Sequence, residues 1–216
     1  MPRDPLKPIP PPAPTRADAR DIVEAILAAA AEVASPAVTT NQIAARAGVG
    51  IASLYRYFPN RAAIFAELSR RMHQAFRVEL DAILARPDLT LAARIRACCT
   101  AAVESQGASR ELRRCLNLLV PYSWSEDSAG DMYAETISAT VAWLERHLPT
   151  APPDLTERVF AAIAAVRGII VMAMLHPAWA PDDERLIELA VAATRPFLDD
   201  LIRADAAAAA PPVEDP

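Results

Sequence analysis

Residues 39–61 concentrate side chains that could hydrogen-bond to a polyanion. The stretch reads TTNQIAARAGVGIASLYRYFPNR. Its polar groups are hydroxyls, amides and guanidinium groups, with no carboxylate among them. Such groups bond phosphate oxygens and the edges of bases. The alternative is an ordinary helical hairpin with a solvated face, but tyrosine hydroxyls interleaved with arginine are unusual on such a face. The stretch therefore predicts a DNA-contacting surface.

The spacing of cap, turn and apolar residues within this stretch predicts a helix-turn-helix. Thr39 and Thr40 are suited to cap a short helix over residues 41–47, and Gly48 is suited to the left-handed residue that ends it. A second short helix is expected from about Gly50. In this motif the second helix enters the DNA major groove. The apolar residues expected to face inward are Ile43, Ala44, Ala47, Val49, Leu54 and Phe58.

Two kinds of DNA contact are expected from this motif. Phosphate contacts are expected from hydroxyl and guanidinium groups, and base contacts from the exposed side of the second helix, where small apolar side chains suit thymine methyl groups. The expected phosphate contacts are Thr40, Tyr55, Tyr57 and Arg61. The expected base contacts are Asn41, Ile51, Ala52, Ser53 and Arg56. Thr39 and Gly50 complete the candidate set as helix-capping residues.

The stretch Ile43–Leu68 resembles the TetR (tetracycline-repressor-like) family of bacterial transcriptional regulators. The resemblance rests on the Ala47-Gly48-Val49 turn, the run Leu54-Tyr55-Arg56-Tyr57-Phe58 and the basic Arg61. It covers roughly residues 16–72. Gly50 departs from the more usual Ser at the helix cap, and Arg61 from the more usual Lys. The resemblance implies a DNA-binding repressor that pairs through its last two long helices, binds a palindromic operator and releases it when a small molecule binds.

Charge is divided unevenly along the chain, whose net charge is −5 over 216 residues. Residues 1–72 hold nine Lys/Arg and six Asp/Glu, whereas residues 73–216 hold thirteen and twenty-one. A mildly basic module joined to an acidic body fits a DNA-binding head on a body that does not bind DNA. The amino-terminal residues include no apolar segment typical of a secretory signal, so a cytoplasmic protein is expected.

Helical periodicity and proline-rich breaks predict an all-α fold with a three-helix DNA-binding head and a helical body. Alanine is abundant, glycine is scarce, and no segment alternates with a period of two. Four regions are expected: a disordered Pro-rich N-terminus over 1–14, a helix-turn-helix domain over 15–60, a ligand-binding and dimerisation domain over 61–205, and a disordered tail over 206–216. Helices are expected over residues 16–34, 60–85, 89–105, 110–120, 127–147, 154–175 and 181–204, besides the two of the motif.

The segment Val159–Leu175 is apolar apart from Arg167. As a membrane span it would be short and would carry a charge near its middle. Burial on two sides, by the body core and by a second subunit, explains it better. The expected homodimer interface combines this segment with the following helix. Its candidate residues are Arg167, Gly168, Ile170, Leu186, Ala190 and Phe197.

Large soft side chains gather in residues 90–180 and could enclose an apolar or amphipathic small molecule. A fully packed core would show the same residues, so both interpretations stay open on the sequence alone. The candidate pocket residues are Cys115, Asn117, Tyr122, Trp124, Met132, Tyr133, Ser138 and Met172.

The sequence contains no pattern that predicts an enzyme, a cofactor or a metal site. It has no phosphate-binding loop, no dinucleotide fingerprint, no HExxH and no nucleophile elbow. Cys98, Cys99 and Cys115 have no zinc-ligand spacing and fit buried core residues of a reducing compartment better than a redox sensor. The alternatives to a DNA-binding regulator are an all-helical small-molecule-binding protein, carrier or enzyme, and a dimeric interaction protein that does not bind DNA.

Overall fold

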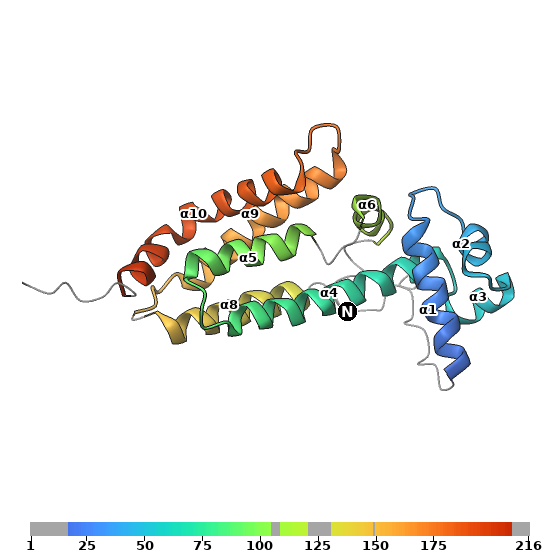
Figure 1. Cartoon of the computed structure of the whole chain (residues 1–216), viewed down its shortest axis with the longest axis horizontal. Helices are drawn as coiled ribbons and strands as arrows, with labels where there is room; N and C mark the ends of the chain where they lie inside the picture. Colours follow the sequence, from blue (N-terminus) through green and yellow to red (C-terminus); the bar gives the residue numbers. More distant parts are fainter. Residues whose placement is uncertain (1–16, 105–108, 121–130, 149, 209–216) are drawn as a thin grey trace, which may run out of the picture. The chain divides into compact units, whose positions relative to one another are not determined.

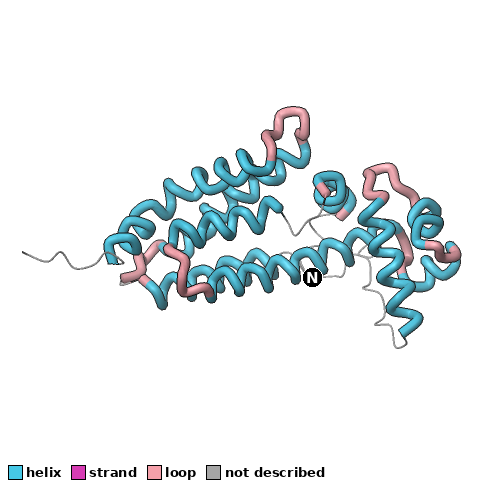
Figure 2. Tube along the Cα trace, in the orientation of Figure 1, coloured by secondary structure: helices cyan, strands magenta, loops and turns pink. Residues whose placement is uncertain are grey.

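A computed structural model of the chain describes residues 17–104, 109–120, 131–148 and 150–208. Every regular element within these ranges is a helix (Figures 1 and 2). The helices are α1 (Ala17–Glu32), α2 (Thr40–Ala47), α3 (Ile51–Tyr57), α4 (Arg61–Ala85), α5 (Leu91–Glu104), α6 (Arg110–Leu119), α8 (Asp131–His147), α9 (Leu155–Leu175) and α10 (Asp183–Ala208). The all-α fold predicted from the sequence is confirmed.

The chain folds into two compact units. The first combines residues 1–74 with 107–131, and the second combines residues 75–106 with 132–216. The contacts therefore divide the chain inside α4, rather than at the boundary after residue 60 that the sequence suggested. They also group α6 with the DNA-binding helices. The predicted functional boundaries stay a prediction, and the expected disordered N-terminus lies outside the described residues.

The core of the first unit is one apolar cluster that joins α1, α2, α3, the start of α4 and α6. Ile26 from α1, Ile43 from α2, Leu54 from α3 and Phe65 from α4 are each completely buried. Full burial of one such side chain stabilises a fold by about 1.5–3 kcal/mol. Because these four helices contribute to the same cluster, the short helices α2 and α3 are held by tertiary packing rather than by their own helix propensity.

In the second unit, α10 packs against both α9 and α5. One apolar cluster joins residues of α5, α8, α9 and α10, and a smaller one is built around Val103, Leu186 and Ile187. Figure 1 shows α9 and α10 running side by side, joined by the loop that contains Trp179. That side chain is 90% exposed.

A buried arginine closes the carboxyl end of α4. Arg94 of α5 is only 4% exposed. Its guanidinium donates hydrogen bonds to the carbonyl oxygens of Ile83, Leu84, Arg86 and Leu89. The bonds to the last three are 3.0, 2.6 and 3.0 Å long, respectively. The same group lies over the Trp143 ring, 4.3 Å from its centroid. The last carbonyls of a helix have no partner within the helix, so Arg94 supplies the missing donors.

Helix boundaries differ from the expected ones by a few residues, and the largest difference is at the end of α10. The helix continues to Ala208, so the first residues of the expected disordered tail are helical. Pro196 lies inside the helix, although proline removes a backbone donor there. Pro196 is exposed, so water can reach the carbonyl that it leaves without a partner.

Candidate nucleic-acid interface

Helix α2 is fixed at both ends by the residues that the sequence marked as caps. The Thr39 side chain accepts from the Gln42 backbone N–H at 3.3 Å, and the Gln42 carboxamide oxygen accepts from the Thr39 N–H at 2.8 Å. At the other end Gly48 adopts φ 67°, ψ 24°. This left-handed conformation costs glycine little, because it has no Cβ. The sequence interpretation missed this reciprocal cap, although the Thr-x-x-Gln spacing that predicts it is present in the sequence.

Helix α3 turns one side inward and the other outward. Leu54 is completely buried in the unit's core, and Phe58 ends the helix from an equally buried position. On the opposite side, Ile51 is 38% exposed and Tyr55 49% exposed, and Ala52 and Arg56 are also exposed. Gly50 is extended at the start of the helix and makes no side-chain cap. The outward side thus presents two apolar side chains, a phenol and a guanidinium.

Hydroxyl and guanidinium groups link the two helices of the motif. The hydroxyls of Thr40 on α2 and Tyr55 on α3 are 3.0 Å apart and share a hydrogen bond. Within α3, Arg56 donates to the Tyr57 hydroxyl at 3.1 Å and lies 4.9 Å from the centroid of the Tyr57 ring. These contacts hold predicted DNA contacts in defined positions before DNA arrives, which lowers the ordering entropy lost on binding.

Arg61, which the sequence predicted as a phosphate contact, bonds backbone carbonyls of its own chain. Its Nη1 donates to the carbonyl oxygens of Pro36 at 3.0 Å and Val38 at 2.6 Å. Nearby, the Asn60 side-chain oxygen accepts from the Ala63 N–H at 2.9 Å and caps the start of α4. The guanidinium of Arg61 is therefore engaged within the protein, where two backbone carbonyls of the α1–α2 connection accept its hydrogen bonds. A DNA phosphate would have to compete with these carbonyls.

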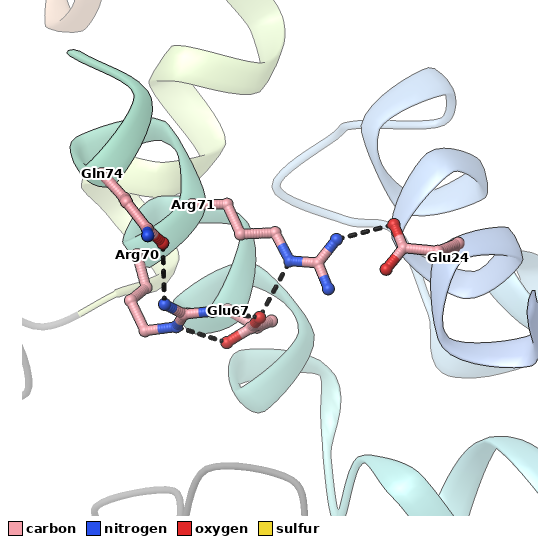
Figure 3. A network of polar contacts seen from close by, with 5 residues as sticks. All are labelled: Glu24, Glu67, Arg70, Arg71 and Gln74. Atoms are coloured by element: carbon pink, nitrogen blue, oxygen red, sulfur yellow. Dashed lines mark hydrogen bonds and ion pairs between the residues drawn. The ribbon is translucent and has the colours of Figure 1, made fainter. Parts of the chain in front are cut away.

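A network of charged residues joins α1 to α4 (Figure 3). Arg71 donates to Glu24 at 2.6 Å and to Glu67 at 2.9 Å, and Arg70 donates two bonds of 2.8 Å to Glu67. Burial by itself would raise the pKa of Glu67, but the hydrogen bonds from Arg70 and Arg71 outweigh it and lower that pKa. Two arginines of the first unit are thus used to join its helices.

Arg46, another basic residue of the motif, forms an exposed ion pair with Glu32 of α1. An exposed pair of this kind contributes at most about 1 kcal/mol to stability. The pair was not expected from the sequence, because Glu32 and Arg46 are distant along the chain and no local pattern connects them.

The predicted pocket residues are only partly described, and those described belong to both compact units. Cys115 is completely buried in the core of the first unit, Ser138 is exposed on α8, and Met172 is 56% exposed on α9. Tyr133 is half-buried, with the Arg167 guanidinium 4.4 Å from its ring centroid. Tyr122 and Trp124 lie outside the described residues, as do the side chains of Asn117 and Met132. The predicted pocket stays a prediction.

The second unit does have an open groove, of a different character. It is lined by Asp154, Arg158, Pro196, Phe197, Asp199, Asp200 and Arg203. Arg158 is paired there with Asp154 at 2.9 Å and Asp200 at 2.6 Å. A surface so rich in charge is unlike the apolar cavity expected for an apolar ligand.

Several predicted dimer residues face the interior of their own protomer. Leu186 is 6% exposed and Ala190 is completely buried. Ile170 packs against the smaller core cluster and Phe197 against the larger one. Arg167 lies over Tyr133, as described above. Only Gly168 is on an exposed side. Packing within the protomer already covers Leu186 and Ala190, and the dimer interface stays a prediction.

The exposed side of α9 is nevertheless apolar. Phe160 is 60% exposed and Met172 is 56% exposed, with the exposed Ala164 and Gly168 between them at four-residue intervals. We call Phe160, Ala164, Gly168 and Met172 the α9 stripe. Among the described residues, α9 is the one helix long and apolar enough to cross a membrane, and only 11% of its most apolar window is buried.

The cysteines are poor candidates for redox chemistry. Burial raises the pKa of Cys98 to about 11 and that of Cys99 to about 12, and it also raises the pKa of Cys115. A thiol of this kind is almost entirely protonated near neutral pH, and the thiolate is the reactive form. Within the described ranges, no group of His, Cys, Asp and Glu side chains could hold a metal ion.

Residues 22–68 match the sequence profile of the family described as "Bacterial regulatory proteins, tetR family". No curated protein sequence is significantly similar to the chain. Solved structures do share its fold. A transcriptional regulator from Rhodococcus sp. Rha1 is 18% identical with a TM-score of 0.61, over 85% of this chain and 97% of that one. A TetR-like transcriptional regulator from the same source is 16% identical with a TM-score of 0.60, over 87% and 99%.

A third similar structure is SmeT, the repressor of the Stenotrophomonas maltophilia multidrug efflux pump SmeDEF. It is 22% identical with a TM-score of 0.55, over 84% of this chain and 90% of that one, and it has also been solved as a SmeT–triclosan complex. These similarities extend over the whole fold, whereas the family profile matches the helix-turn-helix and its flanking helices. The family's members are transcriptional regulators rather than enzymes, which agrees with the lack of catalytic motifs. Residues 22–68 therefore form a TetR-family DNA-binding module, within a fold that the chain shares with solved transcriptional regulators.

Proposed function

We propose that this regulator is a homodimeric repressor that binds a palindromic operator and leaves it when a small apolar or amphipathic molecule binds. The observation that carries the proposal is the outward side of α3, with Ile51, Ala52, Tyr55 and Arg56 exposed on a helix whose other side is fully buried. A side chain that contacts DNA must be exposed on a rigid support, and these four are exposed.

The contacts divide according to side-chain chemistry. Arg56 reads guanine through paired hydrogen bonds, and Ile51 and Ala52 contact thymine methyl groups. Asn41 and Ser53 supply further hydrogen bonds to bases. Thr40, Tyr55 and Tyr57 hold phosphates, since a hydroxyl that shares one hydrogen bond still has capacity for a second. Arg61 is left out of this set because its guanidinium is bonded to backbone carbonyls.

Pairing through the α9 stripe supports the palindromic operator. An exposed apolar helix side in a protein without a membrane role is best covered by a second copy, and a two-fold axis then places the same surface of each protomer in contact. Gly168 and Ala164 allow close approach of helices, and Phe160 and Met172 supply the apolar area. Two recognition helices related by that axis require two half-sites. A cytoplasmic location follows from action on DNA.

The ligand part of the proposal is supported by the SmeT–triclosan complex, in which a repressor with this fold is bound to a small molecule. Binding acts by population shift: the ligand favours a state of the dimer in which the two recognition helices no longer match the half-site spacing. By reciprocity, operator DNA then weakens ligand binding by the same factor.

The first experiment selects DNA from a random pool with the wild-type protein. The proposal expects a palindrome with half-site centres about 10–10.5 base pairs, or a multiple of that, apart. Arg56→Ala should lose about 1–3 kcal/mol on that site and much less on unrelated DNA. Arg203→Ala, which removes the same charge from an exposed position on α10, is the control and should bind as wild type. A selected sequence without two-fold symmetry would contradict the dimeric operator.

The second experiment addresses repression and release. A reporter gene placed behind the selected operator should be silenced by the protein, whereas higher expression would indicate an activator. A thermal-shift screen of apolar, planar and amphipathic compounds, with and without operator, should find ligands whose stabilisation decreases when operator is present. A ligand that stabilises the protein equally in both conditions would contradict the coupling.

A further inference from the structure

Arg61 connects the start of α4 to the segment that leads into α2. Its Nη1 bonds the carbonyl oxygens of Pro36 and Val38, at 3.0 and 2.6 Å. Val38 is itself 4% exposed and belongs to the core of the first unit. A short, charge-assisted hydrogen bond to a carbonyl beside a buried side chain is stronger than a neutral bond in water.

The two carbonyls occupy a sensitive place in the motif. Thr39, the next residue after Val38, forms the reciprocal cap with Gln42 that starts α2. Thr40 follows and bonds the Tyr55 hydroxyl of α3 at 3.0 Å. Hydrogen bonds at three successive residues, Val38, Thr39 and Thr40, therefore connect Arg61, the start of α2 and the outward side of α3. The orientation of α3 therefore depends on the position of residues 36–38, which precede α2.

We propose that Arg61 is a positioning residue for operator recognition rather than a phosphate contact: it holds the α1–α2 connection so that α2 and α3 present their contact residues correctly. The inference rests on the DNA-reading face proposed above. A phosphate contact strengthens binding to every sequence equally, whereas a positioning residue affects mainly the sequence-specific part, because only base contacts require accurate placement.

The first test uses the protein without DNA. Arg61→Met keeps the aliphatic stem of the side chain but removes its charge and donors. Hydrogen exchange of the backbone amides over residues 38–47 should become at least about tenfold faster, because the start of α2 loses its support. Arg46→Met is the matched control: it removes an equal charge from α2 itself, at an exposed ion pair, and should leave exchange within about twofold of wild type. Unchanged exchange in Arg61→Met would overturn the proposal.

The second test measures affinity by fluorescence anisotropy on the selected operator and on an unrelated duplex, over a series of salt concentrations. The proposal expects Arg61→Met to weaken operator binding about tenfold, the effect of roughly one mismatched base pair. Binding to the unrelated duplex and its salt dependence should stay as in wild type. Equal losses on both duplexes, with the slope of log K against log salt reduced by about one, would instead identify a phosphate contact and refute the positioning role.

If Arg61→Met does not fold, Arg61→Lys decides the question. Lysine carries the same charge, so a phosphate contact would survive with wild-type exchange, affinity and salt slope. Its side chain is one bond shorter, so the positioning role expects faster exchange over residues 38–47 and a weaker preference for the operator. Failure of the wild type to select any operator would refute the proposed function, whereas the exchange measurement on free protein would still test the role of Arg61.

Discussion

Truncation of Phe160 should weaken the proposed dimer strongly while leaving each protomer folded. Phe160 lies on the α9 stripe and is 60% exposed in the protomer. The substitution Phe160→Ala therefore removes little intrachain packing. In a two-fold dimer the same substitution occurs twice in the interface, once from each protomer, so its effect on pairing counts twice.

The magnitude follows from the exposed fraction. Complete burial of a phenylalanine side chain is worth about 1.5–3 kcal/mol. Covering the 60% of Phe160 that is exposed would contribute about 0.9–1.8 kcal/mol for each copy, and about 2–4 kcal/mol for the dimer. The dissociation constant of the dimer should accordingly rise by a factor between roughly thirty and several hundred.

Sedimentation equilibrium over a range of protein concentrations measures this constant directly. Val78→Ala is the control, because Val78 is 66% exposed on α4 and does not belong to the α9 stripe. Its dissociation constant should match that of the wild type. Equal constants for Phe160→Ala and wild type would show that the stripe is not the pairing surface, and a wild-type monomer at micromolar concentration would refute the dimer itself.

Three further outcomes are expected. Arg94→Met should lower the free energy of unfolding of the second unit by at least about 3 kcal/mol, because it leaves the carbonyls at the end of α4 without their donor. Urea unfolding measures this loss, and a loss below about 1 kcal/mol would mean that water replaces the guanidinium. Gly48→Ala should lower the free energy of unfolding by about 1–2 kcal/mol, and Gly48→Asn by less, because φ at this residue is 67°. Open space surrounds the position, so an added Cβ meets no neighbouring atom and the cost is conformational. Equal stability of all three proteins would contradict this cause. Burial raises the pKa of Cys98 to about 11 and of Cys99 to about 12, so the unfolded chain loses these protons first. The contribution of the two thiols to stability should therefore be constant below pH 8 and should fall between pH 9 and 11 by up to about 1.4 kcal/mol per pH unit for each thiol. A C98A/C99A variant should lose this dependence, and an identical dependence there would assign it to other groups.

Local signals made the DNA-binding motif predictable. Thr39, Gly48 and Leu54 act through neighbours only a few residues away, so their spacing along the chain already defines a cap, a turn and a buried helix side. The position of Arg61 was not predictable in the same way. Its carbonyl partners, in Pro36 and Val38, are more than twenty residues away, and a basic residue at the start of α4 suits a phosphate equally well.

The proposed pairing surface shows a second limit of prediction from the sequence. On α9 and α10 apolar residues occur on more than one side, so helical periodicity cannot distinguish the side that packs within the protomer from the side left for a partner. Ala190 and Gly168 illustrate the difference: both are small residues in apolar helices, yet one is completely buried and the other exposed. Only the packing of α10 against α9 decides between them.

The reading helices and the α9 stripe belong to different compact units and to segments far apart in the chain. This separation has a genetic consequence. In the proposed dimer, a missense change at Arg56 would leave pairing intact, so in a cell with both alleles the altered subunit would enter mixed dimers and disable the normal partner. A nonsense change before Leu155 removes α9 and α10 altogether, so its product would not pair with the normal subunit. Alleles that damage the reading head should therefore be dominant, and alleles that remove the pairing helices should be recessive.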